Sequence, residues 1–531
     1  MKQFGLDANL KALVIAEAIG AGLMLALRVP PWWVWVVVGV VLLLIATVTY
    51  RGLTAAGWVR KSLRARRVAR QPRADLPAAI AIEPEGSWAD EVGVRYHGDE
   101  IITAVALLGK PHTMTALTGE TASYEDVIPI AVARRMMEQY GGLCLNTVDI
   151  VSAGRRHGAT PSAYTDVYEA LLASRPAAAV RASWLILRLD PKQCLAAVEY
   201  RGDAAAAAVA ATQRIAHEIT LQTGQRVRPL NAARLDAATR TLLGGTTLDQ
   251  ITVGWRDIRG PRDFIQVWAV PAANITSDFL GRMWSPRTNL TVTTIRLSRK
   301  FSGAVDASAV VRMHTASPMA EAPALELESL PARQLDALMY GVPAGTAQTD
   351  PTFAERVPAE QLDELRLPVG SDGQLMGTTS RGFPALMPLS DPAEPTRIVV
   401  RADLPLIQQR VLRAVSGGAR TVVYTDRPQV WARLASSELM IAAPGGGETM
   451  HSPAMVVADL GVSVTRSAAV VMTVVEYSAP DPGPWDVSIR QTEADKMEVA
   501  VGDRAPFTLT VGAARSEQQF LTIPLAQPQP Q

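Results

Sequence analysis

Two long apolar runs follow each other near the start of the chain. The first covers residues 10–27 and contains two charges, Lys11 and Glu17, whereas the second covers residues 32–50 and contains none. Each run is about as long as a helix that crosses the hydrocarbon core of a bilayer. The link between them is short and contains two prolines, which suit a turn. The pattern predicts a transmembrane hairpin over residues 1–51, with one span in each run.

Aromatic residues mark both ends of the second run, as they do at membrane–water interfaces. Trp32, Trp33 and Trp35 stand at its start and Tyr50 at its end, so we expect them to act as a membrane anchor. A cleavable signal peptide is disfavoured because no suitable small-residue site follows the first run. A soluble core helix is disfavoured because the second run has no polar face. The first run could still be an interfacial helix, since Glu17 lies in its middle.

A basic segment follows at residues 52–79 and has no acid before Asp75. Positive charge beside a span stays on the cytoplasmic side of the membrane, so both termini and the bulk of the chain should be cytoplasmic. We expect this segment to lie on anionic lipid headgroups. Nucleic-acid binding, another role of such clusters, is disfavoured by the position next to a span. The basic residues are Arg60, Lys61, Arg64, Arg66, Arg67 and Arg70.

Beyond this segment, strand-like and helix-like patterns alternate, which predicts a mixed α/β region in two lobes. Residues 80–325 form the first α/β domain, and their clearest helix is an alanine-rich stretch over 204–224. Residues 326–395 are rich in proline, alanine and acids, which indicates a linker. Residues 396–520 open with a βαβα pattern and form a C-terminal α/β lobe, and residues 521–531 form a disordered tail. The expected fold class is therefore a membrane-anchored α/β protein.

The composition of the chain bears on nucleic-acid binding, disulfide formation and metal binding. The 531 residues carry a formal net charge of +1, so the basic segment is a local feature rather than a sign of a nucleic-acid-binding protein. The two cysteines, Cys144 and Cys194, stand in apolar surroundings. A disulfide between them is possible in principle, but a cytoplasmic location favours free buried thiols. No cysteine and histidine spacing fits a metal site, and we expect neither a metal nor a cofactor.

The usual catalytic and nucleotide-binding motifs are absent from the sequence. It contains no Walker motif, no G-x-G-x-x-G, no H-E-x-x-H and no G-x-S-x-G. The glycine-rich stretch 443–453 could bind a ligand, but a surface loop explains it as well. Asp426 and Arg427 follow a predicted strand, where α/β sheets bind ligands. A capping aspartate before Pro428 at the start of a helix explains that pattern equally well.

Another polar loop, "SAGRRHG", follows a predicted strand. Its Arg155 and Arg156 could hold a carboxylate or a phosphate. No nucleophile or general base accompanies them, so we favour docking against an acidic partner or the chain's own helix. His157, beside two cations on a loop, is expected to be solvated rather than catalytic.

The strings "LNTVDIVSAGRRHG", "YTDVYEALLASRPAAAVRASWLILRLDP" and "AAVEYRGD", followed by the alanine-rich helix, resemble the EccE family. EccE proteins are membrane core components of mycobacterial type VII (ESX) secretion systems. The resemblance implies a non-catalytic structural subunit of an inner-membrane complex, spanning the membrane twice, that supports assembly of the machine. Its partners would be other membrane subunits, with a separate ATPase subunit among them, and it implies no catalytic residue. The alternative is a membrane-tethered α/β enzyme, such as a transferase of a nucleotide-linked substrate.

Overall fold

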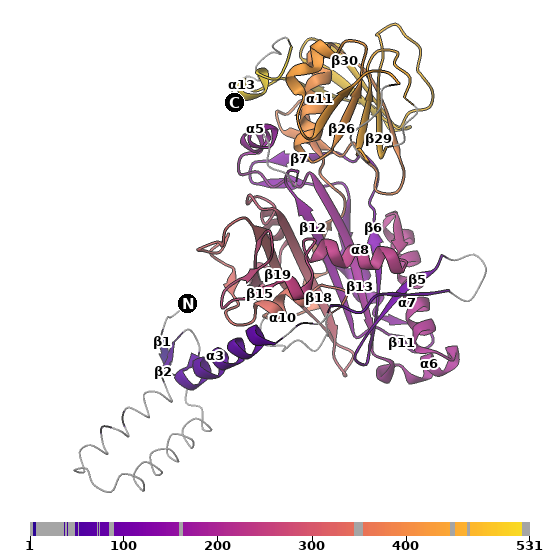
Figure 1. The fold of residues 1–531 in the computed structure, drawn as a ribbon. Helices are drawn as coiled ribbons and strands as arrows, with labels where there is room; N and C mark the ends of the chain where they lie inside the picture. The colour runs from indigo at the N-terminus through magenta and orange to yellow at the C-terminus, as the bar shows by residue number, and fades with distance from the viewer. Residues whose placement is uncertain are drawn as a thin grey trace.

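The chain builds two lobes, each around one large sheet (Figure 1). We call the lower lobe in Figure 1 the first lobe and the upper one the second lobe. The computed structural model describes residues 4–6, 37, 40, 48–50, 53–71, 73, 75–83, 90–158, 163–344, 354–445, 452–464 and 468–522.

The prediction of a membrane-anchored fold, located in the inner membrane through two spans, is contradicted. None of the described helices has both the length and the apolar character needed to cross a bilayer. Most of the two predicted spans, including Trp32, Trp33 and Trp35, lies outside the described residues.

The end of the second predicted span is a strand rather than a helix. β2 (Val48–Tyr50) pairs antiparallel with β1 (Phe4–Leu6) and with β3 (Leu53–Thr54). β-branched and aromatic residues favour strands, and this preference prevails at Val48, Thr49 and Tyr50. Tyr50, expected to close a membrane helix, therefore belongs to a three-stranded sheet. The helix α3 (Ala55–Arg70) follows it directly.

The sheet of the first lobe is antiparallel throughout its described strands. Helices cover both of its faces, so neighbouring residues such as Ala104 and Val105 point into different cores. Strands buried on both faces are mostly apolar along their whole length, and the central strands of this sheet have such sequences. In sheet order the strands are β15 (Thr252–Val253), β16 (Ile258–Arg259), β17 (Phe264–Val270), β19 (Val305–Thr315), β18 (Leu290–Arg299), β12 (Thr147–Arg155), β13 (Val180–Leu189), β6 (Glu100–Leu107), β5 (Val92–His97) and β4 (Ile80–Ile82), with β14 (Val227–Pro229), β20 (Glu328–Ser329) and β21 (Val357–Pro358) pairing at its margins.

One face of this sheet packs against the alanine-rich helix α7 (Ala204–Thr223), and the other against α8 (Ala232–Leu242) and α10 (Gln334–Met339). Asp203 caps the start of α7 through the backbone N–H of Ala206, and Gly224 ends it in a left-handed conformation. The remaining short elements of this lobe are α4 (Ile130–Arg135), β10 (Glu138–Gln139), β11 (Leu143–Cys144), η1 (Pro191–Gln193), α6 (Leu195–Arg201), η2 (Leu248–Gln250), η3 (Ala272–Asn274), α9 (Ser277–Arg282) and η4 (Ala359–Leu362).

The sheet of the second lobe is mixed. Its first six strands are parallel and the rest are antiparallel. In sheet order the strands are β27 (Leu439–Ala442), β26 (Thr421–Tyr424), β28 (Met455–Ala458), β29 (Val470–Val474), β25 (Thr396–Arg401), β30 (Val487–Glu493), β31 (Lys496–Val501), β32 (Phe507–Thr510), β23 (Gln374–Thr378), β24 (Pro384–Met387), β7 (Thr115–Thr118) and β8 (Thr121–Ser123). The helices are α11 (Leu404–Ser416), α12 (Pro428–Trp431), η5 (Ala432–Leu434) and α13 (Arg515–Gln518).

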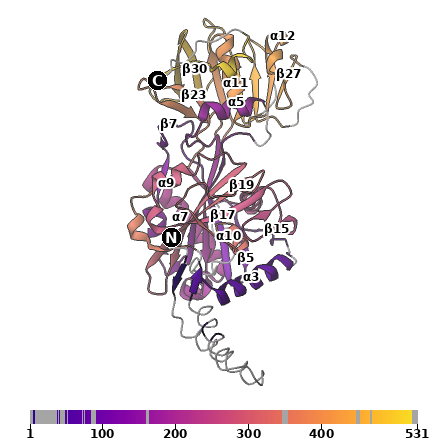
Figure 2. The ribbon, with the colours of Figure 1, turned by 90° about the vertical axis from the view of Figure 1, so that its left-hand side faces the viewer.

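The second lobe is completed by segments from the first half of the chain. The β7–β8 hairpin extends its sheet beyond β24, and α5 (Ala163–Leu172) packs beside α11, as both views show (Figures 1 and 2). The Ser416 hydroxyl donates to the Tyr164 carbonyl at 3.1 Å, and the Tyr164 hydroxyl donates to the Leu434 carbonyl at 2.7 Å. The two lobes are therefore interleaved along the chain.

Residues 326–395, expected to be a linker, are instead part of both lobes. They contribute β20, α10 and β21 to the first lobe and β23 and β24 to the second, and β22 (Arg366–Pro368) pairs with β9 (Val127–Pro129). Leu338 and Val342 of this segment are buried in the core of the first lobe. The expectation failed because these short strands gain their stability from partners far away in the sequence, which composition does not show.

Candidate functional site

The helix α3 carries most of the basic residues for which a charged partner was predicted. Arg64 forms an ion pair of 2.8 Å with Asp336 on α10, which fastens the helix to the first lobe. Lys61 lies half-buried, and this burial lowers its pKa, as does the charge of a nearby arginine. The side chain of Arg60 lies outside the described residues. Arg64 itself is exposed, and the other described basic residues exposed on this helix are Arg66, Arg67 and Arg70.

The two arginines of the "SAGRRHG" loop have different environments. Arg155 ends β12 and is partly exposed, whereas Arg156 is buried and forms a 3.3 Å ion pair with Glu169 on α5. Arg156 is therefore no surface contact: it joins the end of α5 to the first lobe. His157, expected to be solvated, is buried as well and lies 2.7 Å from the Gly158 carbonyl. The backbone carbonyls that accept from Arg156 belong to Ala173, Arg175 and Trp284.

A cleft of about 740 Å³ opens in the second lobe. Its walls come from α5 and the turn after it, from β23 with the turn to β24, and from the end of β32. Leucines, threonines and glycines make up most of its lining, and the ionisable residues among its described lining are Arg175, Arg413 and Asp495. The cleft thus has walls of mixed polar and apolar character with few charges.

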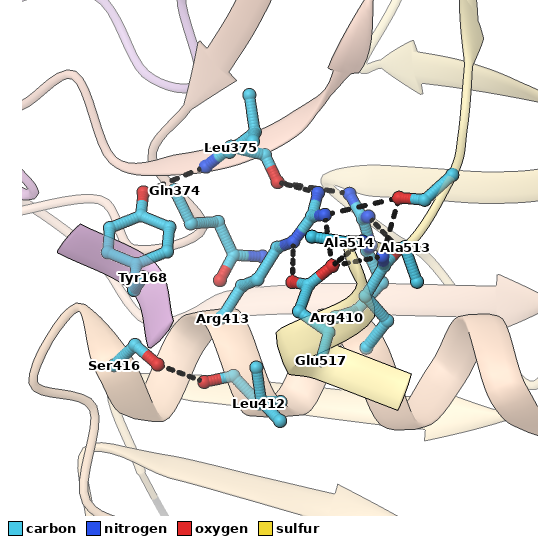
Figure 3. A network of polar contacts seen from close by, with 12 residues as sticks. Tyr168, Gln374, Leu375, Arg410, Leu412, Arg413, Ser416, Ala513, Ala514 and Glu517 are labelled. Atoms are coloured by element: carbon cyan, nitrogen blue, oxygen red, sulfur yellow. Dashed lines mark hydrogen bonds and ion pairs between the residues drawn. The ribbon is translucent and has the colours of Figure 1, made fainter. Parts of the chain in front are cut away.

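A buried ionic network lies beneath this cleft (Figure 3). Arg413 of α11 donates to both carboxylate oxygens of Glu517, at 2.7 and 2.9 Å, and to the Leu375 carbonyl at 3.0 Å. Arg410, one turn earlier, donates to the carbonyl of Met376 and to the side-chain oxygen of Gln409. The network holds the C-terminal segment and β23 against α11.

The network contains two guanidinium groups and one carboxylate, so its charge is not balanced internally. Burial would raise the pKa of Glu517, but the charge and hydrogen bonds of Arg413 outweigh it and hold that pKa below its usual value. Burial, followed by the repulsion of Arg413, lowers the pKa of Arg410 well below its usual value. Because Glu517 already occupies two nitrogens of Arg413, the arrangement is suited to holding structure together and supplies neither a nucleophile nor a general base.

A different buried ion pair, Arg181 with Asp372, joins the first lobe to the second. Arg181 of β13 and Asp372, which precedes β23, are fully buried and lie 2.9 Å apart. The Arg181 guanidinium also lies between the rings of Tyr124 and Trp284, 5.2 and 4.6 Å from their centroids. Desolvated pairs of this kind are strongly destabilising to break, so the junction between the lobes is built to be stiff.

The carboxyl ends of the parallel strands are closed by a further cluster. Arg427, which the sequence singled out, binds both carboxylate oxygens of Asp459 at 2.9 and 2.8 Å. Thr425 and Trp431 donate to the same carboxylate, so the pKa of Asp459 is held below its usual value although burial would raise it. Asp426 is exposed, and residues 446–451 of the glycine-rich stretch lie outside the described residues. The strand ends are therefore used for an internal contact.

Sequence reasoning missed a third buried network, in the centre of the first sheet. Asp149 of β12 pairs with Arg188 of β13 and with Arg296 of β18, the latter at 2.6 Å. Arg188 also donates to the Val342 carbonyl at 2.9 Å, and Arg296 lies 3.8 Å from the centroid of the Tyr340 ring. A single acid inside the apolar string "NTVDIV", with arginines in two other apolar strands, was the signal that could have revealed it.

Comparison with known proteins agrees with the resemblance seen in the sequence. Residues 177–270, from β13 to the end of β17, match the family model described as "Putative type VII ESX secretion system translocon, EccE". The ESX-2 secretion system protein EccE2 of Mycobacterium tuberculosis (strain CDC 1551 / Oshkosh) is 27% identical over 90% of this chain and 87% of its own length. The chain thus contains a stretch that matches the EccE family model and is similar over most of its length to EccE proteins.

Two further relatives come from other ESX systems. The ESX-1 secretion system protein EccE1 of Mycolicibacterium smegmatis is 26% identical over 81% of this chain and 84% of its own length. The ESX-5 secretion system protein EccE5 of Mycobacterium marinum is 28% identical over 64% of this chain and 86% of its own length. The similarity of this chain to EccE proteins therefore reaches well beyond residues 177–270.

Proposed function

We propose that this chain is a non-catalytic structural subunit of a type VII (ESX) secretion system, where it supports assembly and stability of the machine. The observation that carries the proposal is the similarity over 90% of the chain to a protein named for the ESX-2 secretion system. The partners we infer are other subunits of the same system, a separate ATPase subunit included. The exposed arginines of α3 and Arg155 are available to acidic groups of such partners, and those of α3 also to anionic lipid headgroups.

The geometry supports a scaffold role. Three acidic side chains buried in the lobes form ion pairs within the chain. They are Asp149 with Arg188, Asp372 with Arg181, and Glu517 with Arg413. Each of these pairs fixes one segment of the chain against another, and none of them leaves a reactive group facing the cleft. A protein that must hold several partners in fixed positions benefits from such stiffness.

A surface for a partner lies at the far end of the first lobe, where β11 and α6 are seen in Figure 1. Three adjoining segments there expose large apolar side chains. The hairpin β10–β11 carries Tyr140, the turn between β18 and β19 carries Phe301, and the 2.6 Å ion pair of Arg299 with Glu138 joins the two. We call this the distal surface; its members, with their exposed fractions, are Tyr140 (93%), Leu195 (66%), Tyr200 (86%) and Phe301 (96%).

Apolar side chains gathered on a surface mark contacts with other proteins, and aromatic residues dominate the energetics of such contacts. The proposal is tested by purifying the tagged full chain from a host that carries its own secretion system and measuring the co-purified subunits by mass spectrometry. We expect Tyr140→Ser with Phe301→Ser to reduce their yield at least fivefold. Leu325→Ser is the matched control, because Leu325 is equally apolar and 98% exposed but follows the opposite end of β19.

The two parts of the proposal fail in different ways. A wild-type chain that purifies without other secretion subunits contradicts the role as a structural subunit. A double variant that retains them as well as the control does leaves that role intact and shows that the distal surface is not the contact.

A further inference from the structure

The two cysteines of the chain, 50 positions apart in the sequence, meet in the first lobe. Cys144 ends β11, and Cys194 stands between η1 and α6. The Cys144 thiol donates to the carbonyl oxygen of Gln193, the residue before Cys194, at 3.3 Å, and the Cys194 thiol donates to the Asp190 carbonyl at 3.6 Å. Both cysteines are buried and free.

The surroundings make one of the two thiols more acidic than an ordinary cysteine. Contact with the Cys194 side chain lowers the pKa of Cys144 to about 7, against the effect of burial, and the charge of Arg299 adds to this lowering. The carboxylates of Glu138 and Asp190 oppose it. The same contact, together with burial, raises the pKa of Cys194. A pair in which one sulfur is readily ionised and the other keeps its proton has the arrangement of an attacking and a resolving cysteine.

We propose that Cys144 and Cys194 form a redox-active dithiol that a two-electron oxidant of the peroxide class converts into an intramolecular disulfide. The Cys144 thiolate attacks one oxygen of hydrogen peroxide, the O–O bond breaks, and the released hydroxide takes up a proton to become water. The Cys144 sulfenic acid is then attacked by the Cys194 sulfur. The S–S bond forms, the S–O bond breaks, and the leaving hydroxide takes the Cys194 proton as a second water. Two thiols and one peroxide thus give one disulfide and two waters.

The bond would tie two surface elements together. Cys144 belongs to the β10–β11 hairpin, whose turn contains Gly141 and Gly142 in left-handed conformations, and Cys194 directly precedes α6. The closed loop would include β12, α5 and β13, so oxidation constrains a large part of the first lobe.

The test uses the full chain, purified reduced and treated with one to two equivalents of hydrogen peroxide at neutral pH. We expect an intact mass lower by about 2 Da, loss of both alkylatable thiols together, and one cross-linked peptide pair containing Cys144 and Cys194. The folded chain should form this bond at least tenfold faster than the chain unfolded in urea, because the fold brings the thiols together.

The order of events is tested with variants. Cys194→Ser should stop at a Cys144 sulfenic acid that dimedone traps, whereas Cys144→Ser should react at least tenfold more slowly. Thiols that stay alkylatable in the folded wild type, or disulfides formed between chains instead of within one, would overturn the proposal. The wild-type measurement decides the matter even where a variant fails to fold.

Discussion

Replacing Glu517 by Gln removes the carboxylate from the buried network beneath the cleft while nearly preserving the shape of the side chain. Glu517 accepts from Arg413 at 2.7 and 2.9 Å and from Gln409 at 3.0 Å, and it is fully buried. Removing one partner of a buried ion pair costs about 3–5 kcal/mol, because the other charge stays in the interior without compensation. Here two guanidinium groups are left, so we expect a loss at the upper end of this range, about 4–5 kcal/mol.

The measurement is urea unfolding of the full chain, followed by circular dichroism and tryptophan fluorescence. Asp363→Asn is the matched control, because Asp363 also pairs with an arginine, Arg134 at 2.8 Å, but at a surface position. Exposed pairs contribute about 0–1 kcal/mol, so the control should unfold almost as the wild type does. An E517Q variant no less stable than this control would refute the reasoning, since the buried network would then contribute no more to the free energy of unfolding than a surface ion pair does.

The pH dependence gives an independent check. The pKa of Glu517 is lower in the folded chain than its ordinary value of 4.5, so its contribution is fully present above that value. It is lost as the pH falls from about 4.5 through the lower pKa of the folded state, because protonation removes the charge that Arg413 needs. The difference in stability between the wild type and E517Q should therefore shrink below pH 4.5 and stay constant above pH 6. A difference that grows on acidification would contradict the assignment.

Two further predictions concern the first sheet and the packing of the second lobe. Asp149→Asn should destabilise the first lobe by about 3–5 kcal/mol, because it leaves two buried arginines without a carboxylate; urea unfolding measures it, and an unchanged midpoint would contradict the structure. Gly373→Ala should yield little soluble protein, because its φ is +73° and a Cβ would lie 2.2 Å from the backbone nitrogen of Pro388. Gly98→Ala, also at positive φ but with open space around the added atom, should cost only about 1 kcal/mol, and equal behaviour of the two variants in a solubility and melting assay would refute this.

The sequence predicted best those elements whose signals are local. The helix over 204–224 is found as α7, because its alanine content, its capping Asp203 and its terminal Gly224 all act within the helix itself. The strand β12 was recognisable from its largely apolar sequence, and the strand β13 from its alternating pattern. These features depend on neighbours in the sequence.

The predictions that failed depend on partners far away. Apolar residues recur at helical spacing from Ile128 to Met137, but Val127–Pro129 pairs with Arg366–Pro368 and leaves only six helical residues in α4. The linker expected over 326–395 became ordered for the same reason. Docking of Arg156 against the chain's own helix was one of the two expectations, but its individual acceptors on α5, on the turn after it and at Trp284 need the folded chain. The cleft and the pair of cysteines could not be predicted from the sequence for the same reason, because their residues come from segments far apart in the chain.

The interleaving of the two lobes has a consequence for how the chain is made. The β7–β8 hairpin leaves the ribosome early, yet Ala116 pairs with Ala385, which is synthesised roughly 270 residues later. At usual rates of translation this is a delay on the order of 15–50 s. Throughout that interval the partners of the hairpin and of α5 in the second lobe have not yet been synthesised. Once β24 is made, the β7–β8 hairpin pairs with it and covers a sheet edge that could otherwise pair with another chain. Nascent copies thus expose the apolar residues of the hairpin and of α5 during that period, and a fragment that starts after α5 lacks two elements of the second lobe.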